Sequence, residues 1–384
     1  MDHSYFRDLL KQVVAINTIS SDNPEENRSN LDLTAMLTDQ AAELGGSSHT
    51  WHVYQTPVAK DNLLIRFGPD VPGGLMLSGH TDTVPCDASG WRTDPFTLAE
   101  DDDFFYGLGV IDMKGFFAHA LTAIRDLGAP LELKKPLYLL ATVDEETTMN
   151  GAMRFAEHAP IRPDAVLIGE PTSLVPVIKH KGYMAFSVKV EGRSCHSSNP
   201  DAGVSAIKIM NRIVSEICAL EKKLKTKFRD EDFKVPYPTL NIGSIHGGDA
   251  TNRVCGQCEI RLDIRPIRDS SPEELKTLLT EAVKNGAGDD LGRVSVNELY
   301  PPIPGFGTSA DTDLVRLAAV LSGRDPLTVS YSTEASILSS LGSPVVVLGA
   351  GSIDDAHQVN EKLPKNEIER FNGILREMIR RYCQ

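Results

Sequence analysis

The chain has 384 residues, and its formal net charge is −14 because 53 acidic side chains outnumber 39 basic ones. This acidic balance argues against a nucleic-acid-binding protein, which normally presents a basic face. No apolar run approaches the roughly 20 residues that are needed to span a bilayer. The first segment, MDHSYFRDLLKQ, lacks the apolar stretch of a secretory signal. We therefore expect a soluble, cytoplasmic protein with two domains or one large one.

The six cysteines are scattered along the chain, unlike those of a disulfide-rich scaffold. Cys255 and Cys258 form a CxxC pair, which raises the alternative of a zinc or redox module. No second CxxC or HxxxH lies nearby to complete a tetrahedral zinc site. We predict that both are packed thiols within a strand.

The first 180 residues alternate between helical and strand patterns. Apolar residues at helical spacing predict helices near 3–16 and 30–44, and a third helix is predicted from Gly115. Short apolar runs predict buried strands at 63–67, 75–80, 137–143 and 165–170. This alternation indicates an α/β fold in which helices cover both faces of a mixed, mostly parallel sheet.

The pattern changes near residue 182. Strands are predicted at 184–192, 240–248, 258–266 and 293–299, and helices at about 203–224 and 272–283. The order strand, helix, strand, strand, helix, strand resembles a ferredoxin-like α+β unit.

The α/β pattern returns after about residue 300. A helix near 311–322, an apolar strand at 343–351 and a helix near 365–381 are predicted there. We therefore predict a discontinuous main domain of residues 1–181 and 300–384, which is interrupted by an inserted domain of residues 182–299.

Histidines and carboxylates follow the predicted strands of the main domain. They are His80, Asp82, Asp112, Asp144, Glu145, Glu146, Glu170, Asp354, Asp355 and His357. Ligands of open α/β sheets bind outside the carboxyl ends of the strands, so we expect these groups to meet at one edge. A single histidine or acidic loop would more often be an ordinary surface feature. Together these groups favour a metal centre, because adjacent carboxylates repel each other unless a cation or proton compensates.

The number of these groups exceeds what one open catalytic zinc ion requires. Two histidines and three carboxylates suit a site with two metal ions roughly 3.5–4 Å apart, which one carboxylate bridges. A further glutamate then remains free to act as a base on water.

Five motifs containing these residues closely resemble those of the M20 metallopeptidases. They are GHTDTVP (79–85), YGLGVIDMKG (106–115), DEET (144–147), GEPTS (169–173) and AHQVNE (356–361). The resemblance covers essentially the whole chain. It implies a catalytic α/β domain with two Zn²⁺ ions per subunit, for which Co²⁺ is a plausible substitute. It also implies that the inserted domain acts as a lid and forms a homodimer, with no nucleic-acid or membrane partner.

The resemblance also assigns metal ligands. His80 and Glu170 would bind one ion, and Glu146 and His357 would bind the other. Asp112 would bridge the two ions.

Three further residues receive catalytic roles from the resemblance. Asp82 would orient the imidazole of His80, and Glu145 would be the general base. His196, in the inserted domain, would reach into the partner's active site as an oxyanion donor. Thr147 stands where relatives often have glycine, but that position is not a ligand. A non-catalytic protein of this fold would lack a ligand or the base, and none is missing.

The substrate is implied by other segments. TDTVPCDASGWRTDPF and PPIPGF resemble the family members that release acetate from N-acetyl-L-ornithine in arginine biosynthesis. Desuccinylases of succinyl-diaminopimelate, and broader acylamino-acid deacylases, are the alternatives because they share the metal motifs.

Contacts with the substrate are expected from five residues. Arg253, Arg265 and Lys181 are candidates for binding its carboxylate, and Asn252 is a further contact candidate. Glu334 would face the cationic side chain, or would instead be a carboxylate that favours a helix start.

Overall fold

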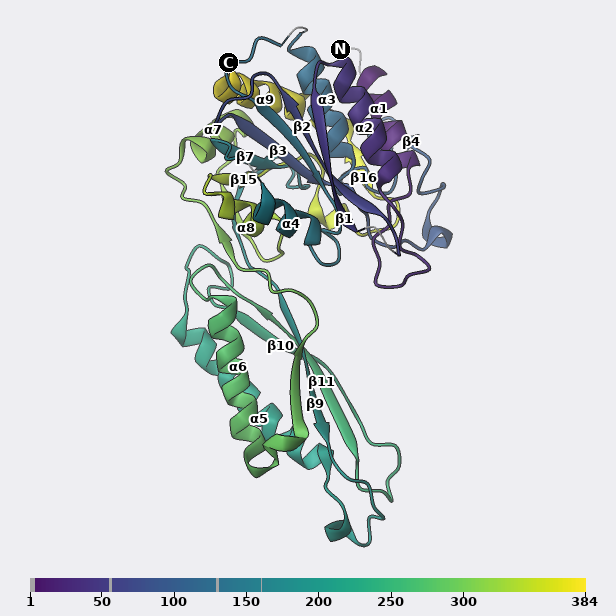
Figure 1. Cartoon of the computed structure of the whole chain (residues 1–384), viewed down its shortest axis with the longest axis vertical. Helices are drawn as coiled ribbons and strands as arrows, with labels where there is room; N and C mark the ends of the chain where they lie inside the picture. Colours follow the sequence, from purple (N-terminus) through teal and green to yellow (C-terminus); the bar gives the residue numbers. More distant parts are fainter. Residues whose placement is uncertain (1–3, 55–56, 129–130, 160) are drawn as a thin grey trace. The chain divides into compact units, whose positions relative to one another are not determined.

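A computed structural model describes residues 4–54, 57–128, 131–159 and 161–384 of the chain. The chain divides into two compact units (Figure 1). Unit 1 comprises Met1–Ile178, Thr308–Leu327 and Thr333–Gln384, and unit 2 comprises Lys179–Gly307 and Thr328–Ser332. The role of residues 182–299 as a lid and dimerisation domain stays a prediction.

Unit 1 is built on a mixed sheet with the strand order β1–β2–β6–β3–β7–β15, which β8 (Val177–His180) and β13 (Phe306–Gly307) continue beyond β15. The strands are β1 (Ser47–Tyr54), β2 (Lys60–Phe67), β3 (Leu75–His80), β6 (Leu137–Thr142), β7 (Ala165–Ile168) and β15 (Val345–Val347). Strands β6, β3, β7 and β15 run parallel, whereas β1 and β2 are antiparallel to their neighbours. The predicted mixed sheet is confirmed; its parallel part is limited to the four central strands, and the strands on both sides of them, β2 and β8, pair antiparallel.

Helices cover both faces of this sheet (Figure 1). On one side, α3 (Gly115–Asp126) and α9 (Lys365–Cys383) pack on the central strands, beside α1 (Ser4–Ala15), α2 (Leu31–Glu43) and α7 (Asp313–Ser322). The other side carries α4 (Asn150–His158) and α8 (Ala335–Leu338). Ten consecutive residues of α3, from Gly115 to Ile124, are buried, which accounts for its apolar sequence GFFAHALTAI.

Shorter elements complete unit 1 and the passage between the units. A small antiparallel sheet contains β16 (Lys362–Pro364), β5 (Phe104–Tyr106) and β4 (Ala99–Glu100). The chain passes between the units at β8 (Val177–His180), β13 (Phe306–Gly307) and β14 (Leu327–Val329). Short 3₁₀ turns are Ala88–Gly90, Pro200–Ala202, Gly288–Arg293, Ser339–Leu341 and Ile353–Asp355.

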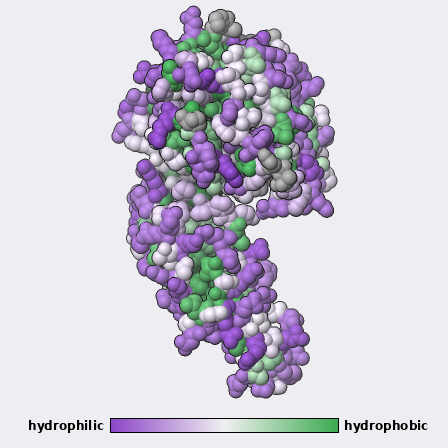
Figure 2. Space-filling view, in the orientation of Figure 1, coloured by the Kyte–Doolittle hydropathy of each residue, from purple (hydrophilic) through white to green (hydrophobic). Residues whose placement is uncertain are grey.

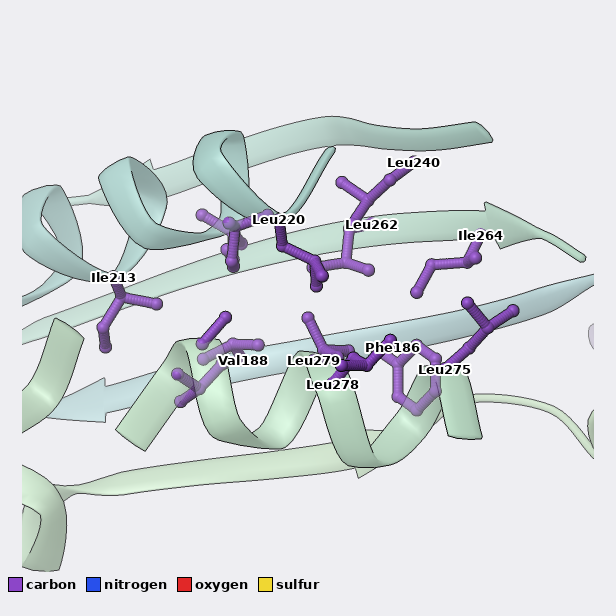
Figure 3. Close-up of a cluster of buried hydrophobic side chains, with 14 of the residues drawn as sticks. Phe186, Val188, Ile213, Leu220, Leu240, Leu262, Ile264, Leu275, Leu278 and Leu279 are labelled. Carbon is purple, nitrogen blue, oxygen red and sulfur yellow. The ribbon is translucent and has the colours of Figure 1, made fainter. Parts of the chain in front are cut away.

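Unit 2 has the predicted ferredoxin-like order. Its elements are β9 (Met184–Glu191), α5 (Ala206–Lys227), β10 (Thr239–Gly247), β11 (Gln257–Arg265), α6 (Pro272–Ala287) and β12 (Val294–Glu298). The four strands form an antiparallel sheet in the order β10–β11–β9–β12. Figure 3 shows apolar side chains of the helices meeting those of the strands, including Ile213, Leu279, Phe186 and Leu262.

The helices of unit 2 begin at capping serines. Helix α5 starts three residues later than 203, because the Ser205 side chain accepts a hydrogen bond from the Lys208 N–H. Ser271 caps α6 in the same way, with Pro272 at the first helical position. Cys255 and Cys258 are buried free thiols, as predicted, but only Cys258 lies within a strand, because β11 begins at Gln257.

Hydrophilic side chains cover most of the face shown in Figure 2. Within the described ranges, no helix combines the length and apolar character that a membrane span requires.

Candidate metal centre

The predicted metal ligands all lie in unit 1, at the ends of neighbouring elements. His80 ends β3, Glu146 follows β6, and Glu170 follows β7. Asp112 precedes α3, and His357 follows the 3₁₀ turn Ile353–Asp355. Because β6, β3 and β7 are parallel neighbours, their carboxyl ends deliver three of these side chains to one edge of the sheet.

The carboxylate of Asp112 lies between the two histidines. Its Oδ1 is 3.0 Å from Nε2 of His80, and its Oδ2 is 3.2 Å from Nε2 of His357. Nε2 of His80 is also 3.9 Å from Oε1 of Glu170, while Nε2 of His357 is 3.0 Å from Oε1 of Glu146. The five side chains thus form two groups that share Asp112, one with His80 and Glu170 and one with Glu146 and His357.

His80 is oriented by the residue two positions further along the chain. Its Nδ1 is 3.0 Å from the main-chain oxygen of Asp82 and 3.5 Å from Oδ1 of the same residue. An oxygen acceptor at Nδ1 favours the tautomer that leaves Nε2 free as a ligand atom. The main-chain oxygen makes the closer contact with the ring.

The Asp82 carboxylate also accepts two main-chain hydrogen bonds, which the sequence did not predict. Its Oδ1 accepts a hydrogen bond from the Glu145 N–H at 3.2 Å, and its Oδ2 accepts one from the Glu146 N–H at 3.1 Å. This carboxylate therefore fixes the loop that presents the predicted base and a predicted ligand.

Lys60 and Asp144 form a buried ion pair at the start of the same loop. Asp144 has a φ of +57° and accepts hydrogen bonds from the Lys60 ammonium and from the Ser20 hydroxyl. Lys60 also donates to Oδ1 of Asn27 at 2.7 Å, and its side chain is only 3% exposed. This buried ion pair balances one of the three consecutive acids, and sequence reasoning missed it because residues 60 and 144 are far apart in the chain.

Burial and neighbouring charges shift the pKa values of the side chains in this cluster. Burial raises the pKa of Glu145 and of Glu170 well above 4.5, and burial followed by the charge of Asp112 raises the pKa of Glu146. Hydrogen bonds to Asp112 and Glu146 raise the pKa of His357 to about 11. Buried carboxylates this close together favour either protons or a cation between them.

The donor set fits metal ions. Ligand atoms of His80, Asp112 and Glu146 lie within 4.8 Å of one another. Imidazole nitrogen and carboxylate oxygen together suit zinc, cobalt or manganese. The residues present therefore fit a metal-binding site, and Asp112 is placed to contact both halves of it.

Comparison with known proteins gives the family. The family model described as Peptidase family M20/M25/M40 matches residues 76–381. The chain belongs to this family. It is 44% identical over 382 residues to the acetylornithine deacetylase of Pectobacterium carotovorum subsp. carotovorum (strain PC1), and the match covers 98% of both chains.

Solved structures share the M20 fold. A tripeptidase from Staphylococcus aureus subsp. aureus mu50 has a TM-score of 0.75 and 22% identity, with 99% of each chain covered. A dinuclear metal-binding M20 peptidase from Bacillus subtilis has a TM-score of 0.66 and 13% identity, covering 98% of this chain and 97% of the other. The family assignment confirms a hydrolase fold with an inserted domain.

Glu334 of this M20 protein lies just before α8 and is fully buried. The side chains around its carboxylate include Thr142, which is a hydrogen-bond partner, and the charged groups of His80 and Asp82. Burial raises the pKa of Glu334 to about 7, and its charge contributes to the raised pKa values of Glu145 and Glu170. Its side chain makes no capping hydrogen bond to α8.

Three predicted residues of unit 2 lie close together in exposed loops. His196 and Arg253 form an isolated antiparallel bridge, and the main-chain oxygen of Asn252 accepts a hydrogen bond from the Ser197 N–H at 2.9 Å. Nδ1 of His196 is 2.7 Å from the Ser198 hydroxyl. Arg253 is paired with Asp249 at 2.5 Å, and both side chains are more than half exposed.

The other two predicted substrate contacts have partners within unit 2. Nε of Arg265 is 3.0 Å from Oδ2 of Asp263, and its guanidinium lies 4.5 Å from the centre of the Tyr183 ring. Lys181 is buried and donates to the main-chain oxygen of Tyr237 at 2.7 Å. Burial lowers the pKa of Lys181 to about 8. Their roles in substrate binding stay predictions.

Proposed function

We propose that this chain is a metal-dependent amidohydrolase that removes the acetyl group from N-acetyl-L-ornithine, giving L-ornithine and acetate. One observation carries the substrate assignment, namely 44% identity to an acetylornithine deacetylase over 98% of both chains. The cluster around Asp112 supports metal-dependent hydrolysis independently of that relative. A place in arginine biosynthesis follows from this substrate, and the cytoplasmic location stays a prediction.

The proposed cofactors are two zinc ions, which cobalt can replace. His80 and Glu170 would hold one ion, and Glu146 and His357 the other, with Asp112 between them. The contact of each histidine with a different oxygen of Asp112 supports this division. When bound, such ions polarise a carbonyl group and lower the pKa of water to about 7.

Glu145 is the proposed general base. It is adjacent to the proposed ligand Glu146, and its main-chain N–H is held by Asp82 at 3.2 Å. Glu145 would take a proton from the attacking water and transfer it to the departing amine, so that one carboxylate serves both halves of the reaction. Its raised pKa agrees with a group that holds a proton between these two steps.

His196 is the proposed donor to the oxyanion, acting from the partner subunit of a homodimer. Its side chain is exposed, and its ring contacts the hydroxyl of Ser198, two residues further along the chain. Self-association through unit 2 is part of the same proposal.

Glu334 is the proposed contact for the side-chain ammonium of ornithine. Its carboxylate is fully buried beside Thr142, and an ammonium group would supply a compensating charge and further donors. Arg253 is the first candidate for the substrate carboxylate, because its guanidinium is more than half exposed and paired only with an exposed acid.

The test is a substrate panel. Amine release by the zinc-loaded protein would be measured with N-acetyl-L-ornithine, N-acetyl-L-methionine and succinyl-diaminopimelate. We expect acetylornithine to lead by at least tenfold in kcat/KM, which is about 1.4 kcal/mol of transition-state discrimination. A lead for succinyl-diaminopimelate would overturn the substrate and leave the metal chemistry, whereas no hydrolysis of any of the three would overturn both.

A further inference from the structure

Glu361 is a buried acid that the proposed mechanism does not use. It is the last residue of the AHQVNE motif and is 2% exposed. Its Oε1 accepts hydrogen bonds from the N–H groups of Ile111, at 2.8 Å, and Asp112, at 3.1 Å. Its Oε2 accepts a third from the Gly109 N–H at 2.9 Å. One carboxylate therefore holds three main-chain donors of the loop that ends in the proposed bridging ligand.

The main chain strengthens the same connection. The Glu361 carbonyl oxygen accepts a hydrogen bond from the Gly107 N–H at 3.2 Å. The next residue, Lys362, pairs with Tyr106 between β16 and β5. Side chain and main chain thus join residues 106–112 to the segment that begins at His357, so the positions of Asp112 and His357 depend on each other.

Three main-chain hydrogen bonds are made to the Glu361 carboxylate, and the buried Lys114 is a positive charge that interacts with it. Within the described ranges, no Lys, Arg or His nitrogen lies within 4.0 Å of its carboxylate. A buried carboxylate without an ion-pair partner is costly unless donors satisfy its oxygens. Three main-chain N–H groups supply those donors, and they belong to a loop whose shape decides where Asp112 points.

We propose that Glu361 is a positioning residue for the metal centre, which holds Asp112 between His80 and His357 by fixing the loop from Gly109 to Asp112. Glu361 binds main-chain donors and acts on the metal ions only through Asp112. This inference rests on the metal centre of the proposed function, but not on the identity of the substrate.

The experiment compares Glu361→Gln with a matched control, Glu367→Gln. Glu367 also accepts a main-chain hydrogen bond, from the Gly351 N–H at 2.8 Å, but among the described residues it accepts none from residues 109–112. The full-length metal-free proteins would be titrated with Co²⁺ alone, and both the affinity and the visible absorption bands of the bound ion would be recorded. Thermal unfolding of the metal-free proteins would be measured in parallel.

We expect Glu361→Gln to weaken Co²⁺ binding by 10- to 100-fold and to change the absorption bands, since residues that support metal ligands have effects of this size. The control should match the wild type. Unchanged affinity and spectrum in Glu361→Gln would overturn the inference, as would an equal loss in Glu367→Gln. A wild-type protein that binds no Co²⁺ would instead overturn the proposed metal centre.

A second measurement covers the case in which Glu361→Gln does not fold. Hydrogen exchange of the wild-type protein would then be followed with and without Co²⁺. We expect the amides of Gly109, Ile111 and Asp112 to gain protection together with residues 357–361. Protection of only one of the two segments would overturn the inference.

Discussion

The proposed metal ligands in unit 1 and the proposed catalytic and substrate residues in unit 2 are held in different ways. In unit 1, His80 and Glu170 are almost completely buried, and main-chain hydrogen bonds fix the loops around them. In unit 2, His196 and Arg253 are exposed, and their side chains pair with residues two and four positions away in the sequence, Ser198 and Asp249. The comparison indicates that unit 1 has a preorganised site, whereas the exposed side chains of His196 and Arg253 in unit 2 are free to adjust to a substrate.

This difference predicts a ranking of effects. Changes in the unit 1 cluster should remove metal or chemistry altogether, because a preorganised site tolerates little displacement. Changes at the exposed residues of unit 2 should reduce the rate without altering metal binding. The predictions below test this ranking, from the largest expected effect to the smallest.

Removal of metal should have the largest effect. Dialysis against a chelator should abolish amine release from N-acetyl-L-ornithine, and Zn²⁺ or Co²⁺ should restore it, because the crowded carboxylates are arranged to hold cations. Metal content measured by elemental analysis should track activity. Full activity in protein without metal would contradict the proposed centre.

Glu145→Gln should lower kcat by about 10²- to 10⁴-fold, because the amide cannot accept the proton of the attacking water. Metal content should remain that of the wild type, since Glu145 is not a proposed ligand. Steady-state kinetics together with elemental analysis would check both points. A variant that keeps its rate would show that another group is the base.

His196→Ala should lower kcat by about 10²- to 10³-fold, the usual effect of removing one oxyanion donor, with metal content unchanged. Differently tagged Glu145→Gln and His196→Ala subunits would then be co-expressed, and the mixed dimer purified. If His196 acts in the partner's site, the mixed dimer contains one complete site and regains about half of the wild-type activity per dimer. An inactive mixed dimer would show that His196 acts within its own subunit.

Glu334→Gln should change specificity rather than chemistry. We expect kcat/KM for N-acetyl-L-ornithine to fall about tenfold or more, because a hydrogen bond between charged groups contributes about 1.5–3 kcal/mol. N-acetyl-L-norvaline, which lacks the side-chain ammonium, is the matched substrate and should be nearly unaffected. An equal loss with both substrates would show that Glu334 positions the site instead of binding the amine.

The double change Cys255→Ala and Cys258→Ala should have the smallest effect. Both thiols are buried, and the proposed centre does not use them, so metal content and kcat should stay near wild-type values. A modest loss of thermal stability is expected from the smaller side chains. Loss of metal would instead support a zinc module in unit 2.

Local sequence predicted most of the helices and strands. The boundaries of α1, α3 and β3 lie within one residue of the prediction, because each combines a clear apolar pattern with a clear start or end. The strand predicted at 343–351 is longer than the observed β15 (Val345–Val347). The apolar run continues beyond the strand into a buried loop that contains Leu348.

The elements that were missed lack a local signal. Most side chains of β1 are exposed, so its sequence shows no apolar run, and only pairing with β2 makes it a strand. Helix α4 follows Met149, which has a φ of +55° and offers no side-chain cap, so no start signal precedes it.

The sequence by itself also determined which residue types follow the strands, and therefore that a carboxylate-rich metal centre was to be expected. Only the tertiary structure decided that Asp112 presents one oxygen to each histidine. It also decided that Lys60 pairs with Asp144, and that Glu361 binds the main chain before Asp112. The reason is physical: these contacts join segments that are far apart in the chain, and several use main-chain N–H groups, which every residue except proline carries and which no sequence motif can mark.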